Sequence, residues 1–423
     1  MPLRRGGERL SAADASNVVM DSRDQVNVFL MAGLLGVGGF VSPDGALEVD
    51  QVRRSIADRL AAGVGSGLAR FSERVQGEGR ALSWERCEPD LTWHVRVSGP
   101  VDGLPGLAAL CGALMTTPLP VDRPLWELLI VPGAAVGRPG IILRVHHAVA
   151  DGVAGVRLVQ RLFGSADDLP EEKPATPRTE AARPRWTTTL AGSVSRLTAL
   201  FRTTVPPTVL LGPIGPQRGV AFAEVDLGTL AAGARTVGAS VNDALLAAVA
   251  VATEAALMAD GQPVPKVLPA SVPVALPDRG RSGNAVGVMM VALPTGEADP
   301  MVRLTRIAQI TRTAKAEART QGTYELTRTR WGTQLFAWLA RRQRFIALFV
   351  TNVRGPEAPL MIAGAPLERA WPVAPIQGNV RLGVAAFSYN GRLGCAVHVD
   401  AAALNADLLG QALGDELARI AAP

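Results

Sequence analysis

Two adjacent histidines, His146 and His147, are the side chains of this sequence best suited to acid–base chemistry. They begin the segment His146-His147-Ala148-Val149-Ala150-Asp151-Gly152 and are half of the four histidines in the chain. Imidazole is the side chain whose unperturbed pKa lies close enough to neutrality for general-base work at physiological pH. The segment therefore predicts a catalytic base.

The neighbouring residues predict a strand before the histidines and a helix after them. An apolar run at 140–145 follows a Pro-Gly turn, and apolar residues recur at helical spacing through 151–163. The histidines thus lie on a strand-to-helix loop that is anchored at both ends. Adjacent side chains on an extended segment point opposite ways, so one imidazole can face a cavity while the other packs behind it.

Asp151 and Gly152 complete the segment, and more than one interpretation is open for them. Asp151 can cap the following helix, or it can turn away and pair with an arginine that fixes the loop. The alternative to catalysis is a pair of hydrogen-bonded core histidines followed by an ordinary capping aspartate. Both interpretations fit the segment taken alone.

Other common catalytic arrangements are missing from the sequence. No serine has a glycine two residues away on both sides, as a GxSxG nucleophile elbow requires. Cys87, Cys111 and Cys395 form no CxxC pair and no activating motif, so we expect reduced, buried cysteines. Adjacent histidines on an extended loop diverge, and Asp151 is the one remaining ligand nearby, so we expect no metal.

The segment 146–152 resembles the HHxxxDG signature of the coenzyme A-dependent acyltransferase superfamily, which condensation domains share. Further motifs narrow the resemblance to the bacterial wax ester synthase/diacylglycerol acyltransferase family, and they span nearly the whole chain. These motifs are Pro124-Leu125-Trp126 with the similar stretch 89–95 before it, the Gly-Pro stretch 212–216, the Asn-Asp helix start at 241–247, Gly283-Asn284 followed by Leu293-Pro294, the stretch 351–356, and the stretch 387–391.

The resemblance implies an α/β (α+β) protein with two chloramphenicol-acetyltransferase-like domains, each a mixed sheet flanked by helices, and an active-site channel between them. It implies an O-acyltransferase that takes acyl-coenzyme A as co-substrate, holds no bound cofactor, and esterifies a long-chain alcohol or diacylglycerol to a wax ester or triacylglycerol. His147 matches, position for position, the family's channel-facing general base, which acts in a ternary complex. His146 then supports it.

Two functions from other classes remain alternatives. The first is a condensation-like acyltransferase of secondary metabolism that acts on a more polar acceptor and takes a carrier-bound acyl donor. The second is a non-catalytic lipid-binding or lipid-droplet protein, which would not need the base. Activity with free acyl-coenzyme A, without a carrier protein, would argue against the first alternative. A loss of turnover when His147 is replaced would argue against the second.

Composition sets the predicted domain boundaries. With 423 residues, 48% of them hydrophobic, the chain exceeds what one core usually organises. Residues 165–185 are rich in proline and charge, a helix with one apolar face is expected over 190–205, and a proline-rich stretch follows at 206–217. We predict an N-terminal domain at 1–164, a linker with a crossover helix at 165–218, and a C-terminal acyltransferase-like domain at 219–423.

Three asparagines are candidates for the channel. Ser240 lies three residues before Asp243, which predicts a capped helix with Asn242 in its first turn. The amino end of such a helix can stabilise a negative oxygen, or Asn242 can simply tie the turn to a neighbouring loop. Asn284 and Asn352 are typical of loop-fixing residues, and either can line the channel.

Arg354 and Trp126 are candidates for substrate or coenzyme A contacts. Arg354 stands where many members of the family have an apolar residue or proline, and the later stretch 375–381 is also polar. A charge beside a long acyl chain is costly, so these residues indicate a more polar acceptor, or Arg354 faces the coenzyme A phosphates. Trp126 also fits a buried strand that begins after Pro124.

Charge and hydropathy limit the partners. A net charge of +5 favours coenzyme A phosphates and anionic lipids, whereas nucleic acid is not expected from a chain with two tyrosines and no recognition motif. The first nine residues lack a signal-peptide core, and the apolar stretch 28–41 is too short to span a bilayer. The stretch 328–349 mixes aromatics with arginines, which fits a membrane-surface helix or a core helix. We expect a cytoplasmic protein, peripheral at the inner membrane face or at lipid inclusions; the oligomeric state stays open.

Overall fold

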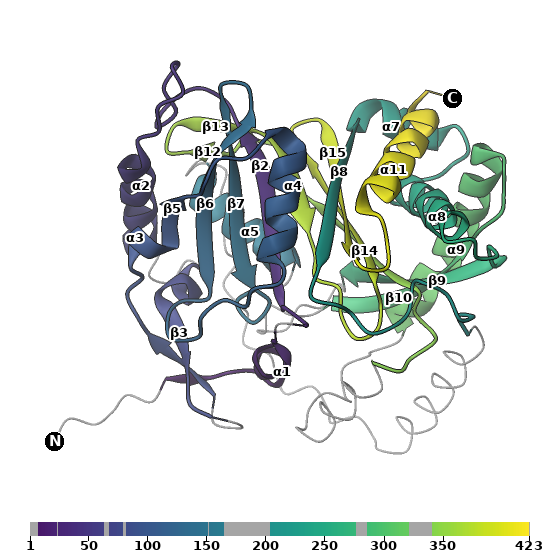
Figure 1. The fold of residues 1–423 in the computed structure, drawn as a ribbon, viewed down its shortest axis with the longest axis horizontal. Helices are drawn as coiled ribbons and strands as arrows, with labels where there is room; N and C mark the ends of the chain where they lie inside the picture. Colours follow the sequence, from purple (N-terminus) through teal and green to yellow (C-terminus); the bar gives the residue numbers. More distant parts are fainter. Residues whose placement is uncertain are drawn as a thin grey trace.

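The computed structural model describes residues 7–22, 24–62, 67–78, 82–150, 152–164, 204–275, 286–320 and 341–422. Within these ranges two six-stranded sheets stand beside each other, each with helices against it (Figure 1). The predicted fold class of mixed sheets flanked by helices is therefore confirmed. The predicted linker at 165–185, and nearly all of the helix expected over 190–205, lie outside the described residues.

The N-terminal sheet has the strand order β12-β13-β2-β7-β6-β5. Neighbouring strands are antiparallel except β5 and β6. Side chains of α2 and α5 share one hydrophobic core with this sheet, and those of α4 share another. The elements are β2 (Val28–Leu35), α2 (Val49–Ala62), α3 (Leu91–His94), β5 (Val95–Val97), α4 (Gly103–Leu114), β6 (Trp126–Ala135), β7 (Arg138–His146), α5 (Gly152–Phe163), β12 (Met361–Ile362) and β13 (Ala365–Val373).

The C-terminal sheet has the strand order β10-β9-β11-β14-β15-β8, and β11 runs parallel to both of its neighbours. Four helices share its main hydrophobic core and lie to the right of β8 in Figure 1. The elements are β8 (Arg218–Asp226), α7 (Leu227–Arg235), α8 (Val241–Ala259), β9 (Val267–Ala275), β10 (Val286–Pro294), α9 (Pro300–Thr320), β11 (Leu348–Arg354), β14 (Leu382–Tyr389), β15 (Arg392–Asp400) and α11 (Ala406–Ala421).

A small third sheet and a short helix lie below the N-terminal sheet in Figure 1. The sheet has the order β1-β4-β3. Helix α1 begins after Ser11, whose side chain accepts a hydrogen bond from the main-chain N–H of Asp14. The elements are β1 (Glu8–Arg9), α1 (Ala12–Met20), the 3-10 turn at Ala69–Ser72, β3 (Glu73–Gln76) and β4 (Ser83–Arg86).

The two halves are interlocked through strands that cross between them. Strands β12 and β13 fall within the stretch 219–423, yet β13 pairs with β2 of the N-terminal sheet. At Gly394 on β15 an added Cβ would lie 2.1 Å from the carbonyl oxygen of Ala370 on β13. At Gly112 on α4 it would lie 2.6 Å from the carbonyl oxygen of Arg218. Glycine at these points lets the backbones of the two halves approach closely.

Helix α8 forms the centre of the C-terminal core. By length and composition it could cross a membrane, and among the described helices it alone meets that test. Two thirds of its apolar window is nevertheless buried, against the sheet and against α9 and α11. A buried helix of a folded domain has the same composition, so α8 is explained by the core that it fills.

The prediction of buried cysteines holds for two of the three. None of the three is in a disulfide; Cys111 and Cys395 are buried, and Cys87 is half-buried. Burial raises the pKa of Cys395 to about 12, so this side chain stays a thiol.

The interpretation of 328–349 as one amphipathic helix is wrong for the part that can be seen. Residues 321–340 lie outside the described residues, and 341–347 form a turn and a loop. Leu348 then begins β11, where it is fully buried. The parallel pairing of β11 with β9 and β14 overrides the local pattern.

Candidate active site

The two histidines lie where β7 ends and before α5 begins, as the sequence predicts. The main-chain N–H of His147 donates to the carbonyl of Asn27 (2.9 Å), and that of Val149 donates to the carbonyl of His146 (2.9 Å). These bonds turn the chain sharply between the strand and the helix. Asp151 lies outside the described residues, so its predicted capping or arginine pairing is not seen.

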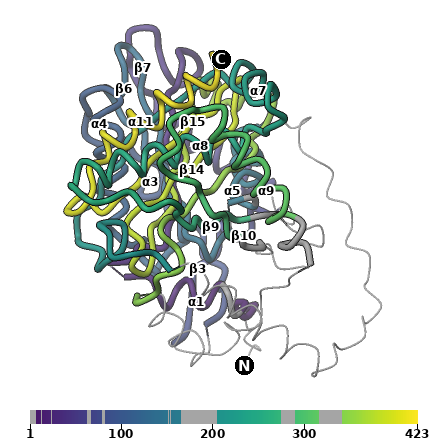
Figure 2. The backbone as a smooth tube through the Cα atoms, turned by 90° about the vertical axis from the view of Figure 1, so that its right-hand side faces the viewer, coloured from purple at the N-terminus to yellow at the C-terminus, as the bar shows by residue number. Residues whose placement is uncertain are grey.

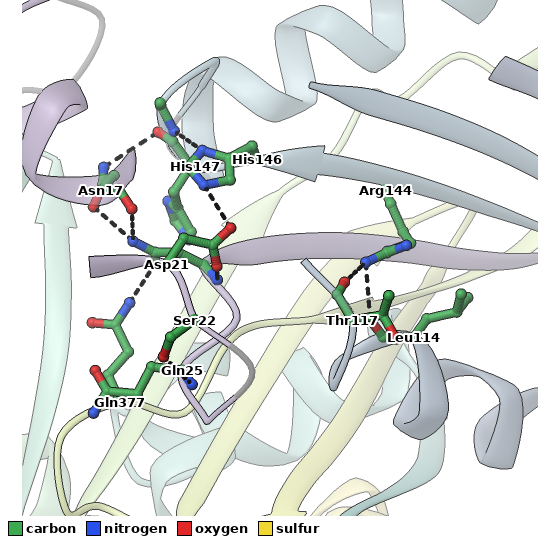
Figure 3. A network of polar contacts seen from close by, with 12 residues as sticks. Asn17, Asp21, Ser22, Gln25, Leu114, Thr117, Arg144, His146, His147 and Gln377 are labelled. Carbon is green, nitrogen blue, oxygen red and sulfur yellow. Dashed lines mark hydrogen bonds and ion pairs between the residues drawn. The ribbon is translucent and has the colours of Figure 1, made fainter. Parts of the chain in front are cut away.

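His146 is buried, with 2% of its surface exposed, and both of its ring nitrogens have neighbours. The main-chain N–H of Ala148 donates to Nδ1 (3.0 Å), so Nδ1 carries no proton. The neutral ring must then be protonated at Nε2, which faces Oδ2 of Asp21 at 3.4 Å (Figure 3). His146 is thus fixed in one orientation and one tautomer.

His147 is half-buried and contacts different neighbours. Its ring stands edge-on to Phe29, with 5.5 Å between the ring centroids. Burial, with a smaller electrostatic effect of the neighbouring His146 ring, lowers the pKa of His147 to about 4. No described residue makes a hydrogen bond to its ring nitrogens. At neutral pH the ring is therefore an uncharged imidazole with a nitrogen lone pair able to accept a proton.

A polar network that the sequence analysis missed holds this loop from below (Figure 3). Asn27, 2% exposed, donates from its main-chain N–H to Oδ1 of Asp21 (2.7 Å). Its side chain donates to the carbonyl and Oδ1 of Asn17 (3.0 and 3.1 Å). Asn17 in turn donates to the carbonyl of His147 (3.5 Å). The one sequence signal for this role is that Asn27, a polar residue, stands directly before the apolar strand β2.

The C-terminal half approaches the same loop through β11. An added Cβ at Gly152 would lie 3.5 Å from the side chain of Val353, so the first turn of α5 lies close to that strand. Asn352, the residue before Val353, donates to Oδ1 of Asn242 (3.5 Å). Two predicted channel residues from separate elements, β11 and α8, are therefore in contact.

The predicted capping box at the start of α8 is confirmed. The main-chain N–H of Asp243 donates to Ser240 Oγ (3.3 Å), and the main-chain N–H of Ser240 donates to Asp243 Oδ2 (2.8 Å). Thr311 Oγ donates to the other oxygen of Asp243 (2.6 Å). Asn242 consequently lies in a rigid first turn, where its side chain ties α8 to β11.

Trp126 is not placed to touch a substrate. Its side chain is fully buried, its indole N–H donates to the carbonyl of Phe71 (2.9 Å), and its ring stacks on His94 at 4.5 Å. The candidate role as a substrate contact is thus corrected, because the side chain fills the core of the N-terminal half. The prediction of a buried strand at this position is confirmed by β6.

Arg354 lies on the surface at the end of β11. Its side chain is 80% exposed and pairs with Glu357. The charge therefore meets solvent and not an apolar wall, which removes the desolvation cost on which the inference of a polar acceptor depended.

The polar stretch 375–381 does not argue for a polar acceptor either, because its side chains are used within the protein. Gln377 donates to Asn27 (2.6 Å), and Asn379 exchanges hydrogen bonds with Gln343 (2.8 and 2.9 Å). Arg381 donates to the carbonyl of Pro213 (3.0 and 3.1 Å). These polar groups fix loops to one another.

The remaining histidines are core residues. His94 and His398 are buried, and in each the Nδ1–H donates to a main-chain carbonyl at 2.7 Å. Burial lowers the pKa of each ring to about 4. In the described part of the chain no three His, Cys, Asp or Glu side chains are grouped to hold a metal ion. Asn284 lies outside the described residues.

Comparison with known proteins identifies two family domains in the chain. Residues 10–204 match the wax ester synthase/diacylglycerol acyltransferase catalytic domain, and residues 282–421 match the C-terminal domain of the same family. A Mycobacterium tuberculosis protein (strain H37Rv), named as a candidate diacylglycerol O-acyltransferase, is 31% identical over 349 residues, covering 73% of this chain and 69% of that protein.

Solved structures share the fold over almost the entire chain. The wax ester synthase/diacylglycerol acyltransferase of Marinobacter aquaeolei VT8 matches with a TM-score of 0.72 at 22% identity, covering 97% of this chain and 98% of that one. Polyketide synthase associated protein 5 of M. tuberculosis matches with 0.58 at 16% identity, covering 98% of both chains. The first condensation domain of the calcium-dependent antibiotic synthetase matches with 0.60 at 17%, covering 99% and 97%.

The chain thus has the fold that condensation domains share, and the family models and the mycobacterial relative make it an acyltransferase. Within that class, the chain belongs to the wax ester synthase/diacylglycerol acyltransferase family. The resemblance inferred from the motifs, and the expectation of an acyltransferase, are confirmed.

Proposed function

We propose that this protein transfers an acyl group from acyl-coenzyme A to the hydroxyl of a long-chain alcohol or a diacylglycerol, with His147 as the general base. The acceptors come from the name of the family and of the mycobacterial relative. Both reactants bind together, and no acyl group is attached to the protein. The products are a wax ester or a triacylglycerol and free coenzyme A.

One observation carries the assignment of the base. Of the two adjacent imidazoles, His146 is buried with both nitrogens occupied, whereas His147 is half-exposed and has no hydrogen bond from the described residues to its ring. A general base must come within hydrogen-bond reach of the proton that it removes. Only His147 meets that condition.

In this reaction His147 carries one proton from the acceptor hydroxyl to the leaving sulfur. A ring nitrogen of His147 takes the hydroxyl proton while the acceptor oxygen forms a bond to the thioester carbonyl carbon. The tetrahedral intermediate then loses coenzyme A as the C–S bond breaks. The imidazolium returns the proton to the departing sulfur, so His147 ends neutral, as it began. His146, held by Ala148 and Asp21, keeps the loop in place during both transfers.

We place Asn242, Asn352 and Gly152 at the wall of the site, between the halves. The amino end of α8, fixed by its capping box, presents main-chain N–H groups that can stabilise the oxyanion of the intermediate. On β11, Val353 lies near Gly152, and the preceding residue, Asn352, points to the opposite face of the strand and bonds to Asn242 at the start of α8.

Arg354 is proposed as a contact for the phosphates of coenzyme A. Its guanidinium is exposed, and it lies on the strand that carries Asn352 and Val353. The substitution Arg354→Ala should raise the KM for acyl-coenzyme A and leave the KM for the alcohol unchanged. Unchanged kinetics for every substrate would remove the basis for this role.

The test is a product assay by mass spectrometry. Purified protein receives palmitoyl-coenzyme A together with a fatty alcohol, a diacylglycerol and a short polar alcohol in competition. We expect ester formation without a carrier protein, and a loss of about 100- to 10,000-fold in turnover for His147→Gln. The matched control is His94→Gln, which removes a buried imidazole that bonds to the carbonyl of Trp126 in the N-terminal core, and this variant should retain activity.

Three outcomes would contradict the proposal. Equal turnover by His147→Gln and the natural protein would show that the base lies elsewhere. A requirement for a carrier-bound donor would favour a condensation-like enzyme. Lipid binding with no ester product would favour a non-catalytic lipid-binding or lipid-droplet protein at the cytoplasmic membrane face.

A further inference from the structure

The loop that carries Gln377 connects the two halves directly beneath the histidines. It follows β13 and precedes β14, and it lies against the loop between α1 and β2 (Figures 1 and 3). Gln377 Nε2 donates to Oδ1 of Asn27 at 2.6 Å, across 350 residues of sequence. Gln25 makes a second, longer bond between the same two loops, from its Nε2 to the carbonyl of Gly378 at 3.4 Å.

Asn27 is the point at which these contacts reach the catalytic segment. Its main-chain carbonyl accepts the hydrogen bond from the N–H of His147, and its main-chain N–H holds Asp21, which faces His146. Its side-chain NH2 group is used by Asn17, so Gln377 supplies the bond to the remaining carboxamide oxygen. Every polar group of this buried residue therefore has a defined partner.

Figure 2, turned by 90° from Figure 1, shows C-terminal elements in front of N-terminal strands, and the pairing of β13 with β2 joins the two halves. The loop at 374–381 is itself fixed on the C-terminal side. Asn379 bonds to Gln343, and Arg381 bonds to Pro213. Because the loop at 374–381 is held by these bonds, the hydrogen bond from Gln377 can hold the Asn27 side chain in one place. A bond from a mobile loop would restrain Asn27 only weakly.

We infer that Gln377 is a positioning residue for His147, through which the C-terminal half sets the place of the catalytic base by way of Asn27. This inference rests on the proposed function. The chain of contacts contains two hydrogen bonds, from Gln377 to the Asn27 side chain and from His147 to the Asn27 carbonyl. Catalytic rates depend steeply on such placement, since a displacement of about 1 Å can cost about 100-fold.

The experiment compares three variants of the full chain in the product assay with palmitoyl-coenzyme A and hexadecanol. Gln377→Met keeps the length of the side chain and removes its donor. Gln377→Lys restores an N–H donor on a half-buried side chain that can reach solvent. Gln25→Met removes the other hydrogen bond between the same loops without touching Asn27, and it serves as the matched control.

We expect kcat of Gln377→Met to fall by about 10- to 100-fold while the KM for acyl-coenzyme A stays within about twofold. Gln377→Lys should recover most of that loss, and Gln25→Met should keep the natural kcat. With four histidines in the chain, the His147 ring can be assigned by NMR from the His147→Gln spectrum. Its signals should shift in Gln377→Met, while those of His94 stay in place.

The results that would overturn the inference differ from those that would overturn the proposed function. An unchanged kcat in Gln377→Met, beside an inactive His147→Gln, would refute the positioning role alone. An equal loss of kcat in Gln25→Met would show that the general contact between the halves matters, and not the bond to Asn27. A Gln377→Lys variant with a kcat as low as that of Gln377→Met would show the same. Full activity of His147→Gln would instead refute the proposed base.

Discussion

The pH dependence of the reaction tests the environment of His147 directly. An ordinary histidine with a pKa of about 6.5 would be only about 9% neutral at pH 5.5, so its activity as a base would fall about tenfold between pH 7.5 and 5.5. Burial lowers the pKa of His147 to about 4, which leaves the ring almost wholly neutral at pH 5.5. We therefore expect kcat/KM to stay nearly constant over this interval.

The assay measures kcat/KM because that ratio reports the free enzyme, to which the pKa of the unliganded structure applies. Phosphate groups titrate near pH 6, so palmitoyl-pantetheine, which lacks the phosphates of coenzyme A, serves as a second donor. Tryptophan fluorescence at each pH checks that the protein remains folded. A tenfold fall centred near pH 6.5 with both donors, in folded protein, would refute the reasoning about burial.

Two further predictions concern stability. The folded-state pKa of His398 is about 4, below its unfolded value, so the unfolded chain binds more protons between pH 6.5 and 4 and stability falls as the pH falls through that window. In urea unfolding at pH 5, His398→Gln should reduce this loss of unfolding free energy by about 2 kcal/mol. An unchanged dependence of the unfolding free energy on pH would contradict the prediction. Glu127→Gln leaves the buried guanidinium of Arg144, 3% exposed, without its carboxylate partner and should cost about 3 to 5 kcal/mol. The control Glu357→Gln, in an exposed pair, should leave the unfolding midpoint unchanged, and equal effects of the two would refute the assignment.

Local signals in the sequence were sufficient for the elements that carry the site. The apolar run before His146 and the helical spacing after it predicted β7 and α5, and the Ser240–Asp243 pair predicted the start of α8. Each of these signals depends on residues a few positions apart, where periodicity and capping act. The motifs then identified the family, because their order along the chain is specific even where each motif is short.

Long-range pairings could not be predicted in the same way. The pairing of β13 with β2, and the bond from Gln377 to Asn27, join residues more than 300 positions apart and leave no local pattern. The same limit explains the correction of Trp126 from a substrate contact to a core residue. Its ring packs against Phe71 and His94, and no spacing within the motif reveals these contacts.

The pair His146-His147 shows how the fold gives two identical side chains different chemistry. A histidine can accept a proton only through a free nitrogen lone pair, and in His146 that lone pair is already used by the N–H of Ala148. Protonating Nδ1 of His146 would break this bond. His147 has no such bond from the described residues, and its burial keeps it neutral without occupying its nitrogens. The difference between the supporting histidine and the base therefore arises from the main-chain turn at Ala148. A substitution that removed the Ala148 hydrogen bond would still not let His146 replace His147, because the His146 ring would remain buried in the core.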